Sequence, residues 1–128
     1  MAKAVRITAG SLTFDGELND TATARRIYEA LPIEGSANRW GDEIYFGIPV
    51  TAGKSDPMRT EMSVGELAFW PAGSALCIFW GPTPASQGDE PRAAGDVVPV
   101  GKLFGVLTQL SEVKDGQAIH LDRRPDCS

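Results

Sequence analysis

The chain has 128 residues, 42% of them apolar and 23% charged, which is typical of one globular domain spanning 1–128. Its net charge of −5 argues against a nucleic-acid partner, because phosphate binding needs clustered Lys and Arg. No apolar run approaches the roughly 20 residues that span a bilayer, and the N-terminus lacks the apolar core of a signal peptide, so we expect a cytoplasmic protein with no membrane partner. The positions of Cys77 and Cys127 predict no disulfide framework.

The N-terminal part of the chain predicts a hairpin followed by a helix. Alternating apolar residues at 3–8 and 12–18 are typical of two half-buried strands. Asn19 to Thr21 is a helix-start signal, because short polar side chains there accept bonds from the first amide groups. Pro32 ends the helix, so we expect one main α-helix at about 20–31. Its apolar stripe consists of Ala24, Ile27, Tyr28 and Leu31.

The segment from Phe69 to Pro84 is the most informative part of the chain. Two apolar runs, 67–70 and 75–80, are too short for globular helices and predict an antiparallel hairpin. Between them lies a turn signal, in which Pro71 fixes φ and Gly73 allows a positive φ without steric cost. Neither run has a polar face, so these strands are either covered on both sides or wall a binding site on one side.

The remaining segments complete a mainly β pattern. We expect an exposed polar loop at 85–95, and a flexible tail at 123–128 after an ordered region of about 3–122. The segment 58–62 is a further candidate strand, and 97–101 is a short apolar run. The other predicted strands are 35–40, 43–48, 102–110 and 118–121. About eight short strands and one helix favour a barrel or a sandwich, with the helix over an open end.

Three segments together carry a resemblance to a known family. They are Leu18–Thr21 before the helix, Asn38–Phe46, and Val64–Pro71 continuing to Ile78–Pro84. In this order they resemble the small single-domain prokaryotic cyclophilin-like proteins, an atypical branch of the cyclophilin fold. The resemblance covers the chain from about residue 5 to residue 121. It implies a closed, mostly antiparallel, eight-stranded cyclophilin-like barrel with one main α-helix.

Three functions stay open under this resemblance. The first is a binding module that takes a peptide or a small apolar ligand in an aromatic-lined groove beside the central hairpin, with no cofactor. The second is a weak, atypical peptidyl-prolyl cis–trans isomerase, although the Phe-His-Arg and Gln-Gly-Gly-Asp motifs of true cyclophilins are not in this sequence. The third, by analogy of fold, is a partner or relative of amide-hydrolase subunits. A homo-oligomer or a partner subunit therefore stays open as well.

One arginine and several aromatic side chains are the candidate site residues. Arg39 is the best candidate for a catalytic arginine, or for fixing a ligand carbonyl or carboxylate; the alternative is a surface arginine stacked on Trp40. The hydroxyl of Thr83 either points into a pocket or belongs to a plain strand terminator. The aromatic residues belong to the core or line a pocket, and two or three are expected to face a cleft. They are Trp40, Tyr45, Phe46, Trp70, Phe79 and Trp80. The predicted ligand-binding set is Arg39, Trp40, Tyr45, Trp70, Phe79 and Thr83.

Acidic and nucleophilic side chains carry less information. Four carboxylates near strand ends match no metal-binding loop, so we expect solvated turn residues and no metal site. They are Asp42, Glu43, Glu61 and Glu66. His120, the one histidine, is expected to be structural or exposed, since it cannot form a metal cluster alone. Cys77 lies between two aliphatic residues and is predicted to be buried and inert.

Overall fold

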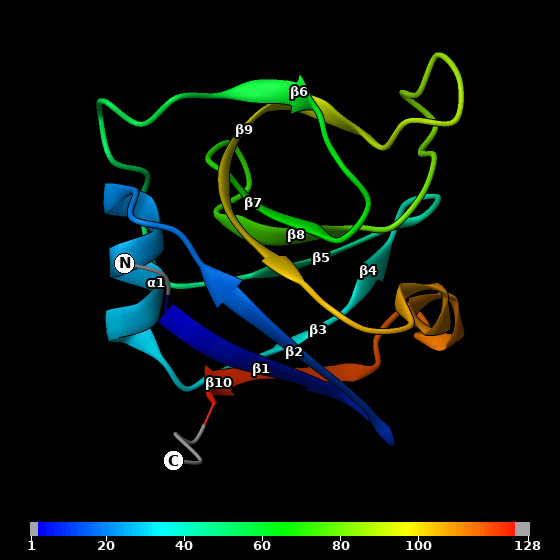
Figure 1. Cartoon of the computed structure of the whole chain (residues 1–128), viewed down its shortest axis with the longest axis horizontal. Coiled ribbons are helices and arrows are strands. Elements are labelled where there is room, and N and C mark those ends of the chain that lie inside the picture. Colours follow the sequence, from blue (N-terminus) through cyan, green and yellow to red (C-terminus); the bar gives the residue numbers. More distant parts are fainter. Residues whose placement is uncertain (1–2, 125–128) are drawn as a thin grey trace.

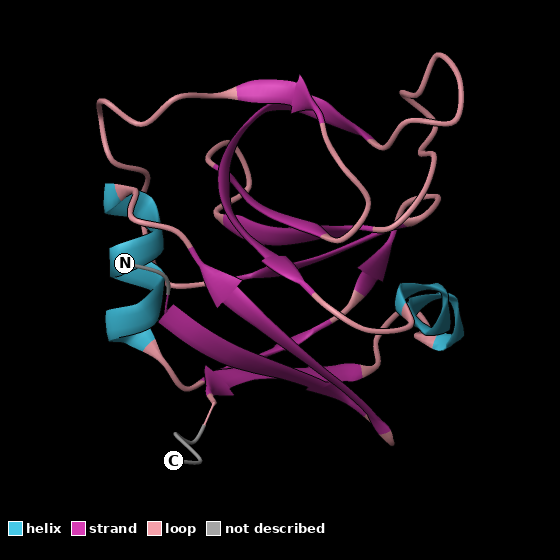
Figure 2. Ribbon diagram, viewed as in Figure 1, coloured by secondary structure: helices cyan, strands magenta, loops and turns pink. Residues whose placement is uncertain are grey.

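The computed structural model describes residues 3–124 and is mainly β, with ten strands in one antiparallel sheet, one α-helix and one short 3₁₀-helix (Figures 1 and 2). The hydrogen-bonded strand order is β3-β10-β1-β2-β9-β7-β8-β5-β4, and β6 pairs with β9 off this path. The strands are β1 (Lys3–Ala9), β2 (Leu12–Leu18), β3 (Ile33–Ser36), β4 (Asn38–Arg39), β5 (Glu43–Gly47), β6 (Arg59–Glu61), β7 (Glu66–Trp70), β8 (Ala75–Phe79), β9 (Arg92–Leu103) and β10 (Ala118–Arg123).

The predicted N-terminal hairpin and the predicted helix are both confirmed. β1 and β2 pair from Lys3–Leu18 to Ala9–Leu12, and their inward residues alternate with partly exposed ones. The helix α1 (Ala22–Ala30) begins after Thr21, whose hydroxyl oxygen accepts a hydrogen bond from the Ala24 amide at 3.1 Å. The apolar stripe buries Ala24, Ile27 and Leu31 in the main core. In Figure 1, α1 and the 3₁₀-helix η1 (Leu107–Glu112) lie at opposite ends of the molecule.

The start of α1 is held by a carboxylate from the loop before β6. Asp56 accepts hydrogen bonds from the amides of Ala22 (3.2 Å) and Thr23 (2.7 Å), and from the Thr23 hydroxyl. That hydroxyl oxygen, which is fully buried, accepts a bond from the Gly53 amide at 2.8 Å. Burial raises the pKa of Asp56, but the bonds from Thr23 and Ala22 outweigh it, so the pKa lies below its usual range.

We expect Asp56→Ala to destabilise the protein by about 1–2 kcal/mol, the range for losing a helix cap. The reason is that two helix amides and one buried hydroxyl lose their acceptor together. Urea unfolding followed by circular dichroism measures the change. Asp89→Ala, in the loop at 85–91, is the matched control and should change stability by no more than about 0.5 kcal/mol. Equal stability of both variants would show that the Asp56 bonds contribute nothing.

The central hairpin is confirmed, but its turn differs in detail from the prediction. β7 and β8 pair antiparallel from Leu67–Ile78 to Trp70–Ala75. The residue with positive φ is Ser74, at 48°, and not Gly73. Gly73 is needed for a different reason: a Cβ there would lie 2.6 Å from the Trp70 ring. The ring therefore packs directly against the turn backbone.

Both faces of this hairpin are covered, each by a different set of side chains. One face contributes to the main core through Leu67, Phe69, Leu76 and Ile78. The other face belongs to a smaller second cluster, which consists of Met62, Ala68, Cys77, Phe79, Ala93 and Val97, with Tyr45 and Trp70 packed against it. Met62, which follows β6, and the β9 residues Ala93 and Val97 supply the cover on this second face. The absence of a polar face in the sequence thus reflects two apolar layers.

Strand β9 corrects two predictions about the last third of the chain. It runs unbroken over twelve residues, so the predicted exposed loop at 85–95 is wrong at its end, where Arg92 to Gly95 are strand and Ala93 is buried. Its first part pairs with β6 and its second part pairs with β7 and β2, across register shifts. The predicted strand at 102–110 is also wrong beyond Leu103. Gly105 has φ of 105°, which ends the extended backbone, and η1 follows.

The predicted closed eight-stranded barrel is not confirmed, because the sheet has ten strands and is open. The predicted strand at 35–40 is broken into β3, which pairs with β10, and β4, which pairs with β5. Among residues 3–124 no ladder joins β3 to β4, the two ends of the strand order. Only Ala37 separates them in the chain; its amide donates to Gln117 O and its carbonyl accepts from Gly116 N, both at 2.8 Å. The backbone itself therefore joins the two edges of the sheet.

The last strand ends later than expected. β10 continues to Arg123, two residues past the predicted strand at 118–121, and the Arg124 amide donates to Ala4 O at 3.1 Å. The rest of the predicted flexible tail, 125–128, lies outside the described residues, and so does the prediction for Cys127. Within residues 3–124, no helix is both long enough and apolar enough to cross a membrane.

Candidate functional site

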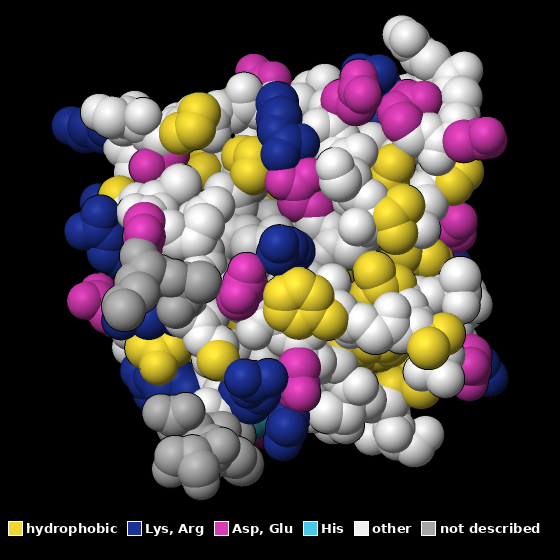
Figure 3. Space-filling model, in the orientation of Figure 1, with side chains coloured by type: hydrophobic (Ala, Val, Ile, Leu, Met, Phe, Trp, Pro, Cys, Tyr) yellow, Lys and Arg dark blue, Asp and Glu magenta, His cyan; other side chains and the backbone are white. Residues whose placement is uncertain are grey.

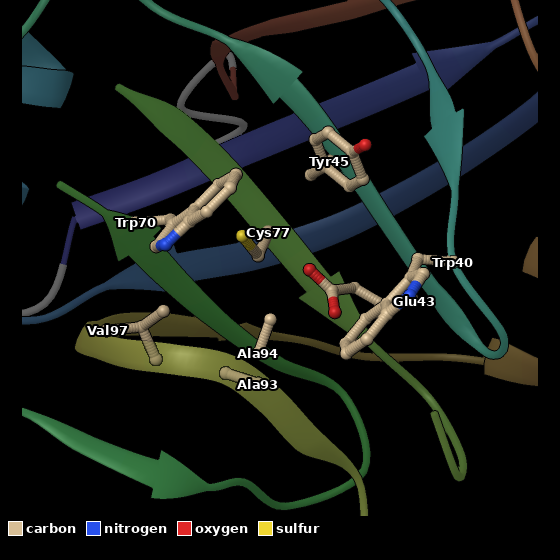
Figure 4. Close-up of a pocket in the computed structure, with 8 residues that line it drawn as sticks. All are labelled: Trp40, Glu43, Tyr45, Trp70, Cys77, Ala93, Ala94 and Val97. Atoms are coloured by element: carbon tan, nitrogen blue, oxygen red, sulfur yellow. The ribbon is translucent and has the colours of Figure 1, made fainter. Parts of the chain in front are cut away.

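A cavity of about 190 Å³ opens on the second face of β5 and β8, opposite the main core (Figure 4). Its lining comes from β5, β7, β8, β9 and the residue that follows β4. The lining residues are Trp40, Glu43, Tyr45, Trp70, Cys77, Ala93, Ala94 and Val97. The volume is close to that of an apolar cavity of about 150 Å³ that holds a benzene ring, and it is smaller than a typical drug-sized pocket. The pocket therefore has room for one compact group.

Strand alternation and register bring these side chains to one side of the sheet. Tyr45 is directly opposite Cys77 on β8, and Glu43 is opposite Phe79. The intervening Ile44 points to the main core, because successive side chains on a strand point to opposite faces. The first part of β9 then crosses over this face and contributes Ala93, Ala94 and Val97. The small alanine side chains leave the space that the pocket occupies.

Two of the aromatic walls meet nearly at right angles. The rings of Tyr45 and Trp70 have centroids 6.1 Å apart and an interplanar angle of 80°. The ring of Trp40 stands on the other side of the pocket, next to Glu43 (Figure 4). All three rings are partly exposed, so their uncovered surfaces are open to a ligand. Edge-to-face rings present both a π face and a ring edge to the space between them.

Glu43 is the one acidic group among the lining residues, and it is buried. Only 4% of the residue is exposed, and its Oε1 atom has no hydrogen-bond partner among the described residues. Burial raises the pKa of Glu43 from its ordinary value of 4.5 to about 7, and a hydrogen bond from the Cys77 thiol lowers it in part. A carboxyl group with such a pKa is present in both protonation states near neutral pH.

The buried thiol of Cys77 is disfavoured as a nucleophile in this setting. Burial raises its pKa well above the ordinary value, and the neighbouring Glu43 carboxyl raises it further. The thiolate is the reactive form of cysteine, and here it is disfavoured at neutral pH. The prediction that Cys77 is buried is confirmed.

The structure brings together three of the six predicted ligand-binding residues: Trp40, Tyr45 and Trp70. Phe79 shares their face of the sheet, but it is fully buried in the second cluster and does not line the cavity. Thr83 is also buried; its hydroxyl donates to Arg92 O and accepts from the Ala85 amide. Thr83 therefore connects the loop to the start of β9, in line with the alternative structural interpretation of this residue.

Arg39, the predicted catalytic candidate, lies on the other face of the sheet. Its register partner is Ile44, a main-core residue, whereas the next residue, Trp40, points into the pocket. Its guanidinium group donates to the carbonyls of Ser111 and Val113, each at 3.0 Å, and to Gly41 O at 3.1 and 3.3 Å. It also lies 5.0 Å from the ring of Trp80, rather than stacking on Trp40. Arg39 thus binds backbone next to η1.

Sequence reasoning missed two contributions to the pocket. Glu43 was predicted to be a solvated turn residue, and that prediction is wrong. A usable signal was its spacing of two from Tyr45, which places both side chains on one face of a strand. Ala93, Ala94 and Val97 were assigned to an exposed loop or a short apolar run. No local pattern in the sequence shows that this segment folds over β8.

Charged side chains also lie outside the pocket. Within residues 3–124, no group of three or more His, Cys, Asp or Glu side chains is arranged to hold a metal ion. On the face shown in Figure 3, Lys and Arg side chains are interspersed with Asp and Glu over the described residues. His120 is partly exposed and lies 3.3 Å from the carboxylate of Glu34, on β3.

Comparisons with known proteins agree with this fold. A family model described as cyclophilin-like matches residues 3–122. A hypothetical protein from Archaeoglobus fulgidus, known from a solution structure, is 34% identical, with a TM-score of 0.80 over 96% of this chain and 95% of that one. The search of curated proteins gave no significant match.

Proposed function

We propose that this chain, which belongs to the cyclophilin-like family, is a binding protein whose pocket accepts one compact apolar group of a peptide or small molecule. The observation that carries the proposal is an open cavity with three aromatic walls and one buried carboxyl group. Ligand pockets characteristically combine apolar walls with a few convergent polar atoms that fix orientation. The volume of about 190 Å³ suits a single ring or a branched side chain.

We expect Trp70→Ala to weaken binding of a ring-sized probe at least tenfold, because it removes one of the aromatic walls. Suitable probes are indole and N-acetylproline methylamide, titrated while amide chemical shifts are followed by NMR. Phe104→Ala is the matched control, since Phe104 is an exposed aromatic residue outside the pocket lining. Ala94→Phe is a second variant, which fills the cavity from its exposed rim. If both pocket variants bound the probes as the wild type does, the pocket would not be the site.

The isomerase alternative has weaker support. An arginine that eases rotation of an X-Pro bond has to reach the bound amide, and the guanidinium of Arg39 is engaged by backbone carbonyls on the opposite face. A protease-coupled assay on a proline-containing tetrapeptide tests this alternative directly. The third candidate, a partner or relative of amide-hydrolase subunits, rests on analogy of fold alone.

A further inference from the structure

We propose that the compact group bound in this pocket is cationic: an alkylated ammonium head held between Trp40, Tyr45 and Trp70, with the Glu43 carboxylate as its counter-ion. This inference rests on the proposed function and specifies the class of ligand. It applies to a methylated amine on a small molecule or on a peptide side chain, because the chemistry of the head is the same in both.

The aromatic walls are the first reason. The face of an aromatic ring carries partial negative charge and attracts a cation within about 6 Å of the ring centroid, most strongly for Trp. Three rings from separate parts of the chain surround the cavity, and two of them meet at 80°. A rounded cation can therefore lie against the π faces of several rings together, whereas a flat neutral ring can stack face to face on only one of them.

The unpaired carboxyl oxygen is the second reason. Oε1 of Glu43 is buried without a hydrogen-bond partner, although nearly all buried polar atoms in proteins have one. None of the eight lining residues is Lys or Arg, so the lining formed by residues 3–124 carries no positive charge opposite Glu43. A bound cation would compensate the carboxylate electrostatically, without a hydrogen bond, and exclusion of water from the site would strengthen the attraction.

The apolar walls favour an alkylated head over a bare ammonium group. An unsubstituted –NH₃⁺ carries three donors, each of which needs an acceptor when it is buried. The lining offers one carboxyl group, while its other side chains are aromatic, aliphatic or the Cys77 thiol. Methyl or methylene substituents instead pack against Ala93, Ala94 and Val97 and leave the charge to the rings.

The direction in which affinity changes with pH distinguishes a cationic ligand from a neutral ligand in the same pocket. A cation requires the ionised form of Glu43, so its affinity rises with pH through about 7. A neutral ligand that accepts a hydrogen bond requires the protonated form, so its affinity falls over the same range. The other titratable groups that face Glu43 are Cys77 on β8 and Tyr45 on β5, while the lining part of β9 contributes none. The raised pKa of Cys77 keeps its titration above this range.

The test compares choline with 3,3-dimethylbutan-1-ol, its uncharged carbon isostere, by NMR titration of the full chain at pH 8 and pH 5.5. We expect choline to bind at least tenfold more tightly than the isostere at pH 8, and to lose at least tenfold in affinity at pH 5.5. Glu43→Gln should reduce the preference to what the three rings alone supply, and remove its pH dependence. Glu29→Gln, at an exposed position on α1, should keep both.

Each other outcome counts against the cationic ligand in a defined way. Equal or tighter binding of the isostere at pH 8 overturns the cationic proposal and leaves the proposed apolar pocket in place. Choline affinity that falls as the pH rises from 5.5 to 8 overturns it as well. If neither compound nor the ring-sized probes shift the pocket resonances, both the cationic proposal and the proposed function fail.

Discussion

Glu43→Gln is expected to make the protein more stable than the wild type at pH 8, by up to about 3 kcal/mol, and to leave stability near pH 4.5 almost unchanged. The physical reason is the cost of burying a carboxylate whose Oε1 atom has no partner. Glutamine has the same shape and stays neutral at both pH values. The effect corresponds to an increase in Tm of roughly 10 °C for a chain of this length.

The direction follows from the proton balance between the folded and unfolded states. Glu43 has an ordinary pKa of 4.5 and a folded pKa of about 7. Between these values the folded state holds a proton that the unfolded state has already released. The contribution of Glu43 to wild-type stability therefore falls as pH rises from about 4.5 to about 7, and becomes level above that. The Gln variant lacks this decline, so the difference between the two proteins isolates the contribution of Glu43.

Thermal unfolding at pH 5, 6, 7 and 8 measures the difference between the two proteins. Glu29→Gln is the matched control, because it removes an exposed carboxylate and should follow the wild-type profile. The carboxyls with lowered pKa, among them Asp56 and Glu90, titrate below this range and affect all three proteins equally. Parallel profiles for the wild type and Glu43→Gln would mean that Glu43 stays ionised at no cost, contrary to its burial.

Arg39→Ala is expected to destabilise the protein by about 2–3 kcal/mol, in the range for lost hydrogen bonds to a charged donor. Its guanidinium group connects the end of β4 to the carbonyls of Ser111 and Val113 in and after η1. Val113 is itself fully buried, so its carbonyl has limited access to water as a replacement partner. Contact with the Trp80 ring is lost as well. Urea unfolding measures the loss.

Binding in the pocket should respond differently to the same substitution. Arg39 lies on the opposite face of the sheet, so the variant should bind the ring-sized probes with an affinity within about twofold of the wild type. Loss of a residue that contacts the probe directly would reduce the affinity much more. Arg25→Ala is the matched control, since its exposed guanidinium donates to Asp20 O at 3.1 Å in the loop before α1. An Arg39→Ala protein that is as stable as the wild type but no longer binds the probes would show that Arg39 serves binding and not stability.

Local patterns in the sequence were sufficient for most of the elements. The alternation in β1 and β2, the apolar stripe of α1 and the turn between β7 and β8 each depend on residues close together in the chain. A strand repeats every two residues and a helix about every 3.6, so these periods can be recognised without knowing the neighbours. The family resemblance gave the same overall class, which the family match confirms.

Pairing between distant segments decided the rest. Nothing local separates β3 from β4, because the break at Ala37 arises from its bonds to Gly116 and Gln117 near the C-terminus. Likewise, β9 is one strand because β6, β7 and β2 each pair with a part of it. These contacts join segments far apart in the sequence, so the prediction of a closed eight-stranded barrel had no local test.

The candidate site shows the same division between sequence and tertiary structure. The sequence by itself determined which side chains are aromatic and that Tyr45 alternates with core residues. The predicted ligand-binding set therefore includes the three aromatic residues that line the pocket, Trp40, Tyr45 and Trp70. Only the tertiary structure decided that Glu43 is buried and that Arg39 faces away from the pocket. The environment of a charged side chain is set by the residues around it, and here these come from several strands and include the β9 residues Ala93, Ala94 and Val97. Spacing along one strand predicts the face of the sheet on which a side chain lies, but not whether that side chain is buried or solvated.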